Sequence, residues 1–208
     1  MKILILGIYR TGSTSLQYGI SEQGYTPIFE PYNPNRIYSK QYEFPMLELL
    51  GDDDIVVKCI TDQIPNNVSN DSIEFYNNFI NSFDVTILLS RRNKEDHFIS
   101  FLHHLYHRLN NMDSHKKYEI NMDLIYDYFT SDFIDKSKEH LFIQYDTIEK
   151  ISSDTMIPIT YYEDLYNSNK DIVLKTLSNF NLCNIDINKL SDYLNINKKY
   201  RVTKTTII

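Results

Sequence analysis

A short segment rich in glycine and hydroxyl residues, 7–14, has the composition of an anion-binding turn. An apolar run over residues 2–8 leads into it, and a helical pattern begins at Thr14, so the segment joins a predicted strand to a predicted helix. Its glycine spacing is that of a P-loop, in which backbone N–H groups at a helix N-terminus point at a phosphate. The sequence therefore predicts a site for a phosphate-like group at this turn.

The same segment differs from a Walker A loop at the position whose side chain binds the phosphates of a nucleoside triphosphate. Ser13 stands in place of the lysine that reaches the β- and γ-phosphates, and the basic residue is Arg10 instead. The early predicted strands end near Arg10, Lys58 and the pair Arg91-Arg92, and none ends in the aspartate that holds Mg²⁺ in such enzymes. These residues favour neutralisation of an anion by side-chain charge, without a metal, over hydrolysis of ATP or GTP.

Residues 9–16, Tyr-Arg-Thr-Gly-Ser-Thr-Ser-Leu, resemble the 5′-phosphosulfate loop of sulfotransferases that use 3′-phosphoadenosine 5′-phosphosulfate (PAPS). The resemblance implies that the 5′-phosphosulfate lies against the backbone of residues 11–14 and the hydroxyls of Ser13 and Thr14, with Arg10 supplying the compensating charge. The residues that it assigns to cofactor binding in this loop are Arg10, Thr11, Gly12, Ser13, Thr14 and Ser15. The alternative is a glycine-containing turn that only caps the helix with Ser13.

A second motif lies where an apolar strand pattern, residues 85–90, runs into Arg91 and Arg92. Arg92 is followed by Asn93, by Asp96 and, eight residues on, by Ser100, and this run resembles the 3′-phosphate signature of the same family. The resemblance implies that the Arg92 guanidinium and the Ser100 hydroxyl bind the 3′-phosphate. The alternatives are a surface salt bridge from Arg92, for instance to Asp96, and a Ser100 bonded to its own helix.

A weaker match covers residues 157–165, a strand pattern that leads into Tyr-Glu-Asp-Leu, as sulfotransferases commonly have. The basic residues 198–201 stand where the family often has a late loop at the 3′-phosphate, but its Arg-Lys-Gly pattern is missing. A solvated charge cluster is an equally good interpretation of that tail.

Sulfuryl transfer needs a base for the acceptor and positive charge at the leaving oxygen. Lys58, at the end of a predicted strand, resembles the family's lysine beside the transferring sulfate, although a strand-end lysine that only reaches solvent fits equally well. Ile60 stands where many cytosolic members have a catalytic histidine. Glu30 resembles the glutamate base of carbohydrate and tyrosyl-protein sulfotransferases, and its alternative is an ion pair with Arg10. The predicted catalytic residues are therefore Glu30, Lys58 and Arg10.

Several histidines gather on one predicted helix, with His103 and His107 four residues apart. No HExxH glutamate and no set of cysteines or carboxylates at ligand spacing accompanies them, so no metal is predicted. His103 or His104 is a candidate to line the acceptor site or to replace Glu30 as the base.

The predicted function is transfer of a sulfuryl group from PAPS to a hydroxyl or amine on a small-molecule, sugar or lipid-like acceptor. Two rivals stay open: a P-loop kinase for nucleotides or small molecules, and a non-catalytic nucleotide-binding protein of the same fold. The Ser13 position and the Arg92–Ser100 pair argue against the kinase.

The elements that must position these residues alternate between strand and helix patterns. Strands are expected at residues 2–8, 26–29, 54–60, 84–90 and 155–160, with helices at 41–50, 71–83, 94–112, about 121–151 and 168–194. The expected fold is α/β, a single domain over residues 1–208 with a central, mostly parallel sheet flanked by helices, as in P-loop NTPase-like sulfotransferases. Loops at 31–40 and 61–70 follow strands and are expected to form walls of the site.

Composition limits the partners and the compartment. The chain has 208 residues, 42% of them hydrophobic and 24% charged, which is ordinary for one globular domain. Its net charge of −7 disfavours nucleic acids, heparin-like polyanions and anionic lipid. The apolar run at residues 2–8 is too short for a membrane span and lacks a signal-peptide cleavage site. Cys59 and Cys183 show no metal or disulfide spacing, so a reducing, cytoplasmic location is expected.

Overall fold

The computed structural model describes residues 1–32, 54–63, 77–110 and 122–196. Its centre is a sheet of five strands in the order β2-β3-β1-β4-β5, and every neighbouring pair is parallel. The strands are β1 (Lys2–Gly7), β2 (Thr26–Phe29), β3 (Ile55–Ile60), β4 (Val85–Ser90) and β5 (Ile159–Tyr161). The expected mostly parallel α/β sheet is thus confirmed, and it is parallel throughout.

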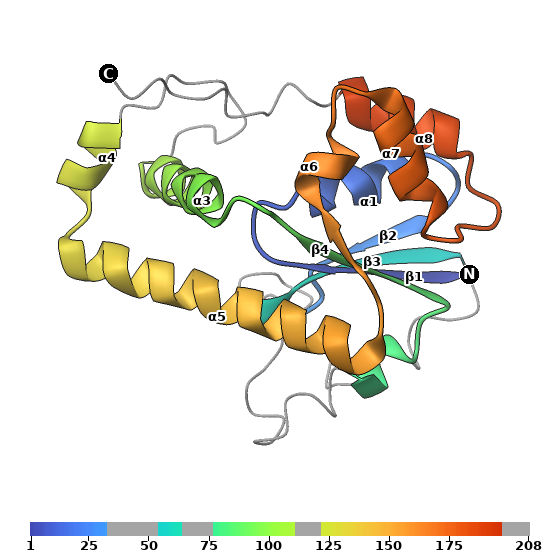
Figure 1. Cartoon of the computed structure of the whole chain (residues 1–208), viewed down its shortest axis with the longest axis horizontal. Helices are drawn as coiled ribbons and strands as arrows, with labels where there is room; N and C mark the ends of the chain where they lie inside the picture. The colour runs from blue at the N-terminus through green and yellow to red at the C-terminus, as the bar shows by residue number, and fades with distance from the viewer. Residues whose placement is uncertain (33–53, 64–76, 111–121, 197–208) are drawn as a thin grey trace.

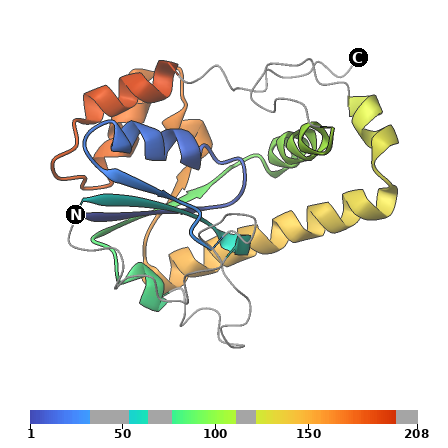
Figure 2. The ribbon, with the colours of Figure 1, turned by 180° about the vertical axis from the view of Figure 1, so that it is seen from behind.

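Helices cover both faces of this sheet. The helices are α1 (Ser13–Ser21), α3 (Lys94–Leu109), α4 (Met122–Tyr128), α5 (Ser131–Thr155), α6 (Tyr162–Leu165), α7 (Lys170–Ser178) and α8 (Ile187–Ile196), and a 3₁₀ turn, η3 (Thr61–Gln63), follows β3. Figures 1 and 2 show α1, α7 and α8 on one face and the long α5 across the other. Two faces that are both covered require strands that are apolar on both sides.

The central strand shows why the apolar runs form this sheet. Leu4 and Leu6 of β1 point into a core shared with α3 and α5, and Ile3 and Ile5 point into the opposite core, shared with α1, α7 and α8. All four side chains have no exposed surface, which is the two-sided burial that a continuous apolar run predicts. The first strand is therefore central, and loops from β3 and β4 flank its carboxyl end.

Three expected elements differ from the structure. The helical block expected at 168–194 is two helices, α7 and α8, separated by residues 179–186. The strand expected at 155–160 begins only at Ile159, because α5 continues to Thr155 and ends at Met156, which adopts a left-handed conformation at φ 59°. The helical block expected at about 121–151 is two helices, and Thr130 caps the second by accepting a hydrogen bond from the Phe133 N–H at 3.3 Å. The expected helix at 41–50, most of the two loops at 31–40 and 61–70, residues 71–76 and the basic tail lie outside the described residues.

None of the described helices is long and apolar enough to cross a membrane.

Candidate functional site

The turn between β1 and α1 contains two left-handed residues and is held by side-chain hydrogen bonds to its backbone carbonyls. The Thr11 hydroxyl donates to the Ile8 carbonyl at 2.8 Å, while Arg10 and Gly12 have φ of 60° and 78°. A Cβ on Gly12 would lie 2.4 Å from Cε2 of Tyr166, so this position requires glycine for space as well as for conformation. The Tyr166 hydroxyl donates to the Gly12 carbonyl at 2.7 Å and fixes the turn from the far side.

The first turn of α1 faces the carboxyl edge of the sheet. Gly12 occupies the cap position with no side-chain cap, and Ser13 is the first helical residue, so Ser13 is not the cap that the alternative interpretation required. The first intrahelical bond at this end runs from the Leu16 N–H to the Gly12 carbonyl. The N–H groups of Ser13, Thr14 and Ser15 precede it and have no helical acceptor, which is the geometry that binds anions at helix N-termini.

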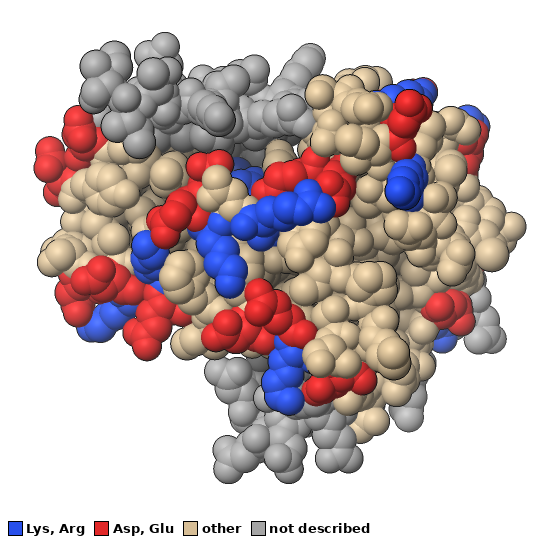
Figure 3. All heavy atoms as spheres, in the orientation of Figure 1, with Lys and Arg blue, Asp and Glu red and all other residues tan. Residues whose placement is uncertain are grey.

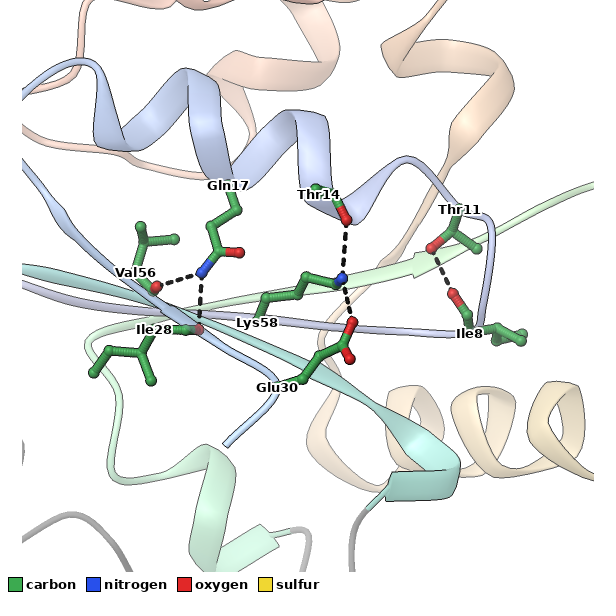
Figure 4. Close-up of polar contacts among 8 residues, drawn as sticks. All are labelled: Ile8, Thr11, Thr14, Gln17, Ile28, Glu30, Val56 and Lys58. Carbon is green, nitrogen blue, oxygen red and sulfur yellow. Dashed lines mark hydrogen bonds and ion pairs between the residues drawn. The ribbon is translucent and has the colours of Figure 1, made fainter. Parts of the chain in front are cut away.

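Lys58 and Glu30 meet beside this helix start (Figure 4). The Lys58 ammonium donates to the Thr14 hydroxyl at 2.9 Å and to a Glu30 carboxylate oxygen at 2.5 Å. Only 7% of the Lys58 side chain and 12% of the Glu30 side chain are exposed. The Glu30 N–H donates to the Lys58 carbonyl at 2.8 Å, so β3 holds both ends of Glu30. The structure therefore joins two of the predicted catalytic residues, and Glu30 has Lys58 as its ion-pair partner.

A glutamine that sequence reasoning did not single out positions the helix over these residues. Gln17 is fully buried, and its side-chain amide donates to the carbonyls of Ile28 and Val56, both at 2.8 Å. These two bonds tie α1 to β2 and β3 beside Glu30 and Lys58, at the residues two positions before each of them (Figure 4). A polar residue one turn after Thr14 on the buried face of the helix was the only signal for it in the sequence.

Arg92 lies at the outer edge of the site and is already paired. Its guanidinium donates to both carboxylate oxygens of Asp164, at 2.7 and 2.6 Å, and 52% of its side chain is exposed. The hydrogen bonds to Asp164 raise the pKa of Arg92. A surface salt bridge was the alternative interpretation, and its partner is Asp164, because Asp96 instead bonds Asn93 at the start of α3. To bind a 3′-phosphate, Arg92 would have to leave Asp164.

Arg91 and Arg10 are the inner arginines of this edge. The Arg91 guanidinium carbon lies 4.2 Å from the centre of the Tyr162 ring. Burial lowers the pKa of both arginines, and the positive charge of Arg91 lowers the pKa of Arg10 further. In the described part of the chain, the buried Nε atoms of Arg10 and Arg91 have no hydrogen-bond partner.

His97 links α3 to the anion-binding turn. One ring nitrogen contacts the Tyr9 carbonyl, and the other lies 2.6 Å from the Tyr145 hydroxyl. Burial lowers the pKa of His97 to about 3, so the ring is neutral, with Nε2–H donating to Tyr9 and Nδ1 accepting from Tyr145. This histidine is a structural connection that sequence reasoning did not anticipate.

His103, the alternative base, points to another histidine. Its Nε2 lies 2.8 Å from Nε2 of His107, and burial, followed by the His107 charge, lowers the pKa of His103 to about 4. Ser100, one turn earlier on α3, is only 2% exposed. Among the described residues, no three His, Cys, Asp or Glu side chains are grouped to hold a metal ion.

Asp62 extends the site on the α5 side of the sheet. It accepts a hydrogen bond from the Tyr9 side chain, His140 Nε2 lies 3.6 Å away, and burial raises the pKa of the carboxyl group. The neighbouring Thr61 hydroxyl donates to the Gln144 side-chain oxygen at 3.0 Å. The contact with Tyr9 places the start of the loop after β3 beside the β1–α1 turn.

The predicted site residues thus fall into two sets. Lys58 contacts both Thr14 and Glu30, and the turn that carries Arg10, Thr11 and Gly12 adjoins them at the same sheet edge. Arg92 and Ser100 lie on the β4–α3 side, one paired and one buried. A comparison with protein-family models finds no matching family, and a comparison with curated protein sequences finds no matching relative. The sulfotransferase resemblance therefore stays a prediction.

Proposed function

We propose that this protein transfers a sulfuryl group from PAPS to a hydroxyl or amine of a small-molecule, sugar or lipid-like acceptor. The observation that supports it is the contact of the Lys58 ammonium with both the Thr14 hydroxyl of the turn and the Glu30 carboxylate. A cation and a proton acceptor thereby lie side by side in front of a helix N-terminus. Sulfuryl transfer needs these two groups at the bond that breaks and the bond that forms.

The proposed reaction is a direct displacement at sulfur. The acceptor oxygen or nitrogen forms a bond to sulfur as the bond from sulfur to the bridging phosphate oxygen breaks, and the electron pair of that bond stays on the phosphate. Glu30 takes the proton of the acceptor, while Lys58, Arg10 and the first N–H groups of α1 stabilise the charge on the leaving phosphate. The products are the sulfated acceptor and adenosine 3′,5′-bisphosphate.

Charge at the turn supports PAPS over a metal-bound triphosphate. The positive groups at this edge include the side chains of Arg10, Lys58 and Arg91, and Ser13 has no ammonium with which to reach a γ-phosphate. A kinase of the same fold is the second candidate. A thermal-shift comparison separates them, because adenosine 3′,5′-bisphosphate without metal should raise Tm for a sulfotransferase and Mg-ATP alone for a kinase.

The decisive experiment measures release of adenosine 3′,5′-bisphosphate from PAPS by the full chain across a panel of alcohols, sugars and amines. We expect Glu30→Gln to lower kcat at least 100-fold with little change in nucleotide affinity. Glu22→Gln, at an exposed carboxylate at the end of α1, is the matched control and should retain full activity. Absence of turnover with every acceptor, or full turnover by Glu30→Gln, would contradict the proposal or the role of Glu30.

A further inference from the structure

Two arginines leave neighbouring strands at the same edge of the sheet. β1 and β4 are parallel with Gly7 opposite Leu89, so Arg10 and Arg91 follow the paired positions by three and two residues. The Ile8 N–H also donates to the Leu89 carbonyl, at 3.4 Å, which keeps the two chains together as they leave the sheet. Backbone geometry therefore brings Arg10 and Arg91 to the same edge of the sheet, next to the β1–α1 turn.

Both guanidiniums are largely withdrawn from water and close enough to repel. Burial lowers the pKa of each arginine, and the charge of Arg91 is the next largest influence on Arg10. Two desolvated like charges are unfavourable unless an anion lies between them. In the described ranges, the Nε–H groups of both lie buried without an acceptor, which leaves donors for an oxyanion to satisfy.

Carboxylates form hydrogen bonds with the outer arginine, whereas the charges of Glu163 and Asp96 act on Arg91 without preventing the net lowering of its pKa by burial. Both carboxylate oxygens of Asp164 accept hydrogen bonds from the Arg92 guanidinium, and Glu163 accepts one from the Arg92 backbone N–H at 3.1 Å. Arg91 instead rests on the Tyr162 ring at 4.2 Å, a contact that orients the guanidinium without neutralising it. Figure 3 shows Lys and Arg side chains gathered near the middle of this face, with acidic side chains around them.

We infer that Arg91 acts with Arg10 as a two-armed site for one tetrahedral oxyanion group, phosphate or sulfate, held in front of the N-terminus of α1. Guanidinium groups match such oxygens through parallel hydrogen bonds, and the first N–H groups of α1 add donors from a third side. Arg92, the arginine that the sequence pattern selects, is then an outer residue of the motif. The inference deepens the proposed function because it concerns the same site, but it requires only the anion.

The test compares two adjacent arginines in the full chain by titration calorimetry. The probes are inorganic sulfate, pyrophosphate and adenosine 3′,5′-bisphosphate, and the variants are Arg91→Met and, as the matched control, Arg92→Met. We expect Arg91→Met to lower the affinity for pyrophosphate at least tenfold and Arg92→Met to change that affinity less than twofold. Equal effects, a larger effect of Arg92→Met, or no effect of Arg91→Met would overturn the inference.

The outcomes separate this inference from the proposed function. Pyrophosphate binding that depends on Arg91, with no binding of adenosine 3′,5′-bisphosphate to the unaltered chain, supports the two-armed site and contradicts the nucleotide. If the unaltered chain binds the bisphosphate tightly and Arg91→Met leaves that affinity unchanged, the result supports the nucleotide and contradicts the two-armed site.

A role of Arg91 in folding alone is distinguished by two further measurements. Arg91→Lys keeps the positive charge but loses the paired donors of the guanidinium. This variant should fold, and its affinity for pyrophosphate should be several-fold lower than that of the unaltered chain. In the unaltered chain with ¹⁵N-labelled arginine, pyrophosphate should shift the Nε–H signals of Arg10 and Arg91 and leave that of Arg92 in place. If only Arg92 shifts, the inference is wrong.

Discussion

Two ion pairs in this protein join the same types of group and lie in opposite surroundings. Lys58 and Glu30 are nearly buried beside the β1–α1 turn, whereas Arg92 and Asp164 lie at the outer edge, with the Arg92 side chain 52% exposed. The inner pair also contacts Thr14 at the start of α1, and the outer pair spans two surface segments. Removal of one member of a buried ion pair strongly destabilises the folded state, whereas an exposed pair contributes little stability and its members can change partners. We therefore expect the inner pair to be fixed in place and the outer pair to be replaceable by a ligand.

Removing one member of the inner pair should have the largest effect. We expect Lys58→Met to lower the free energy of unfolding by about 3–5 kcal/mol, because Glu30 would keep a buried charge without its partner. Urea unfolding followed by circular dichroism measures this. Lys136→Met, in an ion pair with Asp132 whose members are 72% and 73% exposed, is the control and should cost less than about 0.5 kcal/mol. Equal losses would remove the contrast between inner and outer pairs.

The turn that carries the inner site should be the next most sensitive. Gly12→Ala forces a Cβ into the Tyr166 ring at a φ of 78°, so we expect a loss of about 3 kcal/mol or more in the free energy of unfolding. Gly24→Ala is the matched control: its φ is 101°, yet nothing lies within 4 Å of the added Cβ. That variant should lose only the conformational part, about 1 kcal/mol. Thermal unfolding of the two proteins side by side measures the contribution of Tyr166.

Acid should destabilise the inner region through His97. Its pKa is about 3 in the folded chain and about 6.5 when unfolded, so the unfolded chain binds the extra proton as the pH falls from 6.5 toward 3. At pH 5 this amounts to a loss of about 2 kcal/mol relative to pH 7. His97→Gln should reduce the slope of the stability curve over that interval. His103, whose pKa burial lowers to about 4, contributes a slope of its own there, so the result that would contradict the assignment is a slope in His97→Gln equal to that of the unaltered chain.

The outer pair should matter least for stability and most for selectivity. We expect Asp164→Asn to change the free energy of unfolding by less than about 1 kcal/mol, and the difference should shrink in high salt. If Arg92 binds a 3′-phosphate, the same change should strengthen binding of adenosine 3′,5′-bisphosphate and leave pyrophosphate unaffected. Asp192→Asn, which breaks an exposed pair with Lys170, is the control for both measurements. Unchanged bisphosphate affinity would exclude Arg92 from the site.

The strands and the inner site were predictable because both follow from local patterns. Apolar runs at β1, β3 and β4 are buried on both faces, and the carboxyl ends of parallel strands share one edge, which is why Lys58 and Glu30 could be expected near the turn. The pairing of Arg92 with Asp164 spans 72 residues, and that of His97 with Tyr9 spans 88. Such contacts depend on how helices pack, so neither the ion pair of Arg92 with Asp164 nor the burial of Arg91 could be deduced from spacing.

The hydrogen bond from Tyr166 to the Gly12 carbonyl joins residues 154 positions apart. During synthesis the ribosome releases the turn early, and the side chain that braces it emerges only after most of the chain has been made. A nascent chain arrested before Tyr166 has the glycine and hydroxyl residues of the turn but not the ring that packs on Gly12 and holds its carbonyl. The order of translation thus delays this brace of the turn until α6 and Tyr166 have been made.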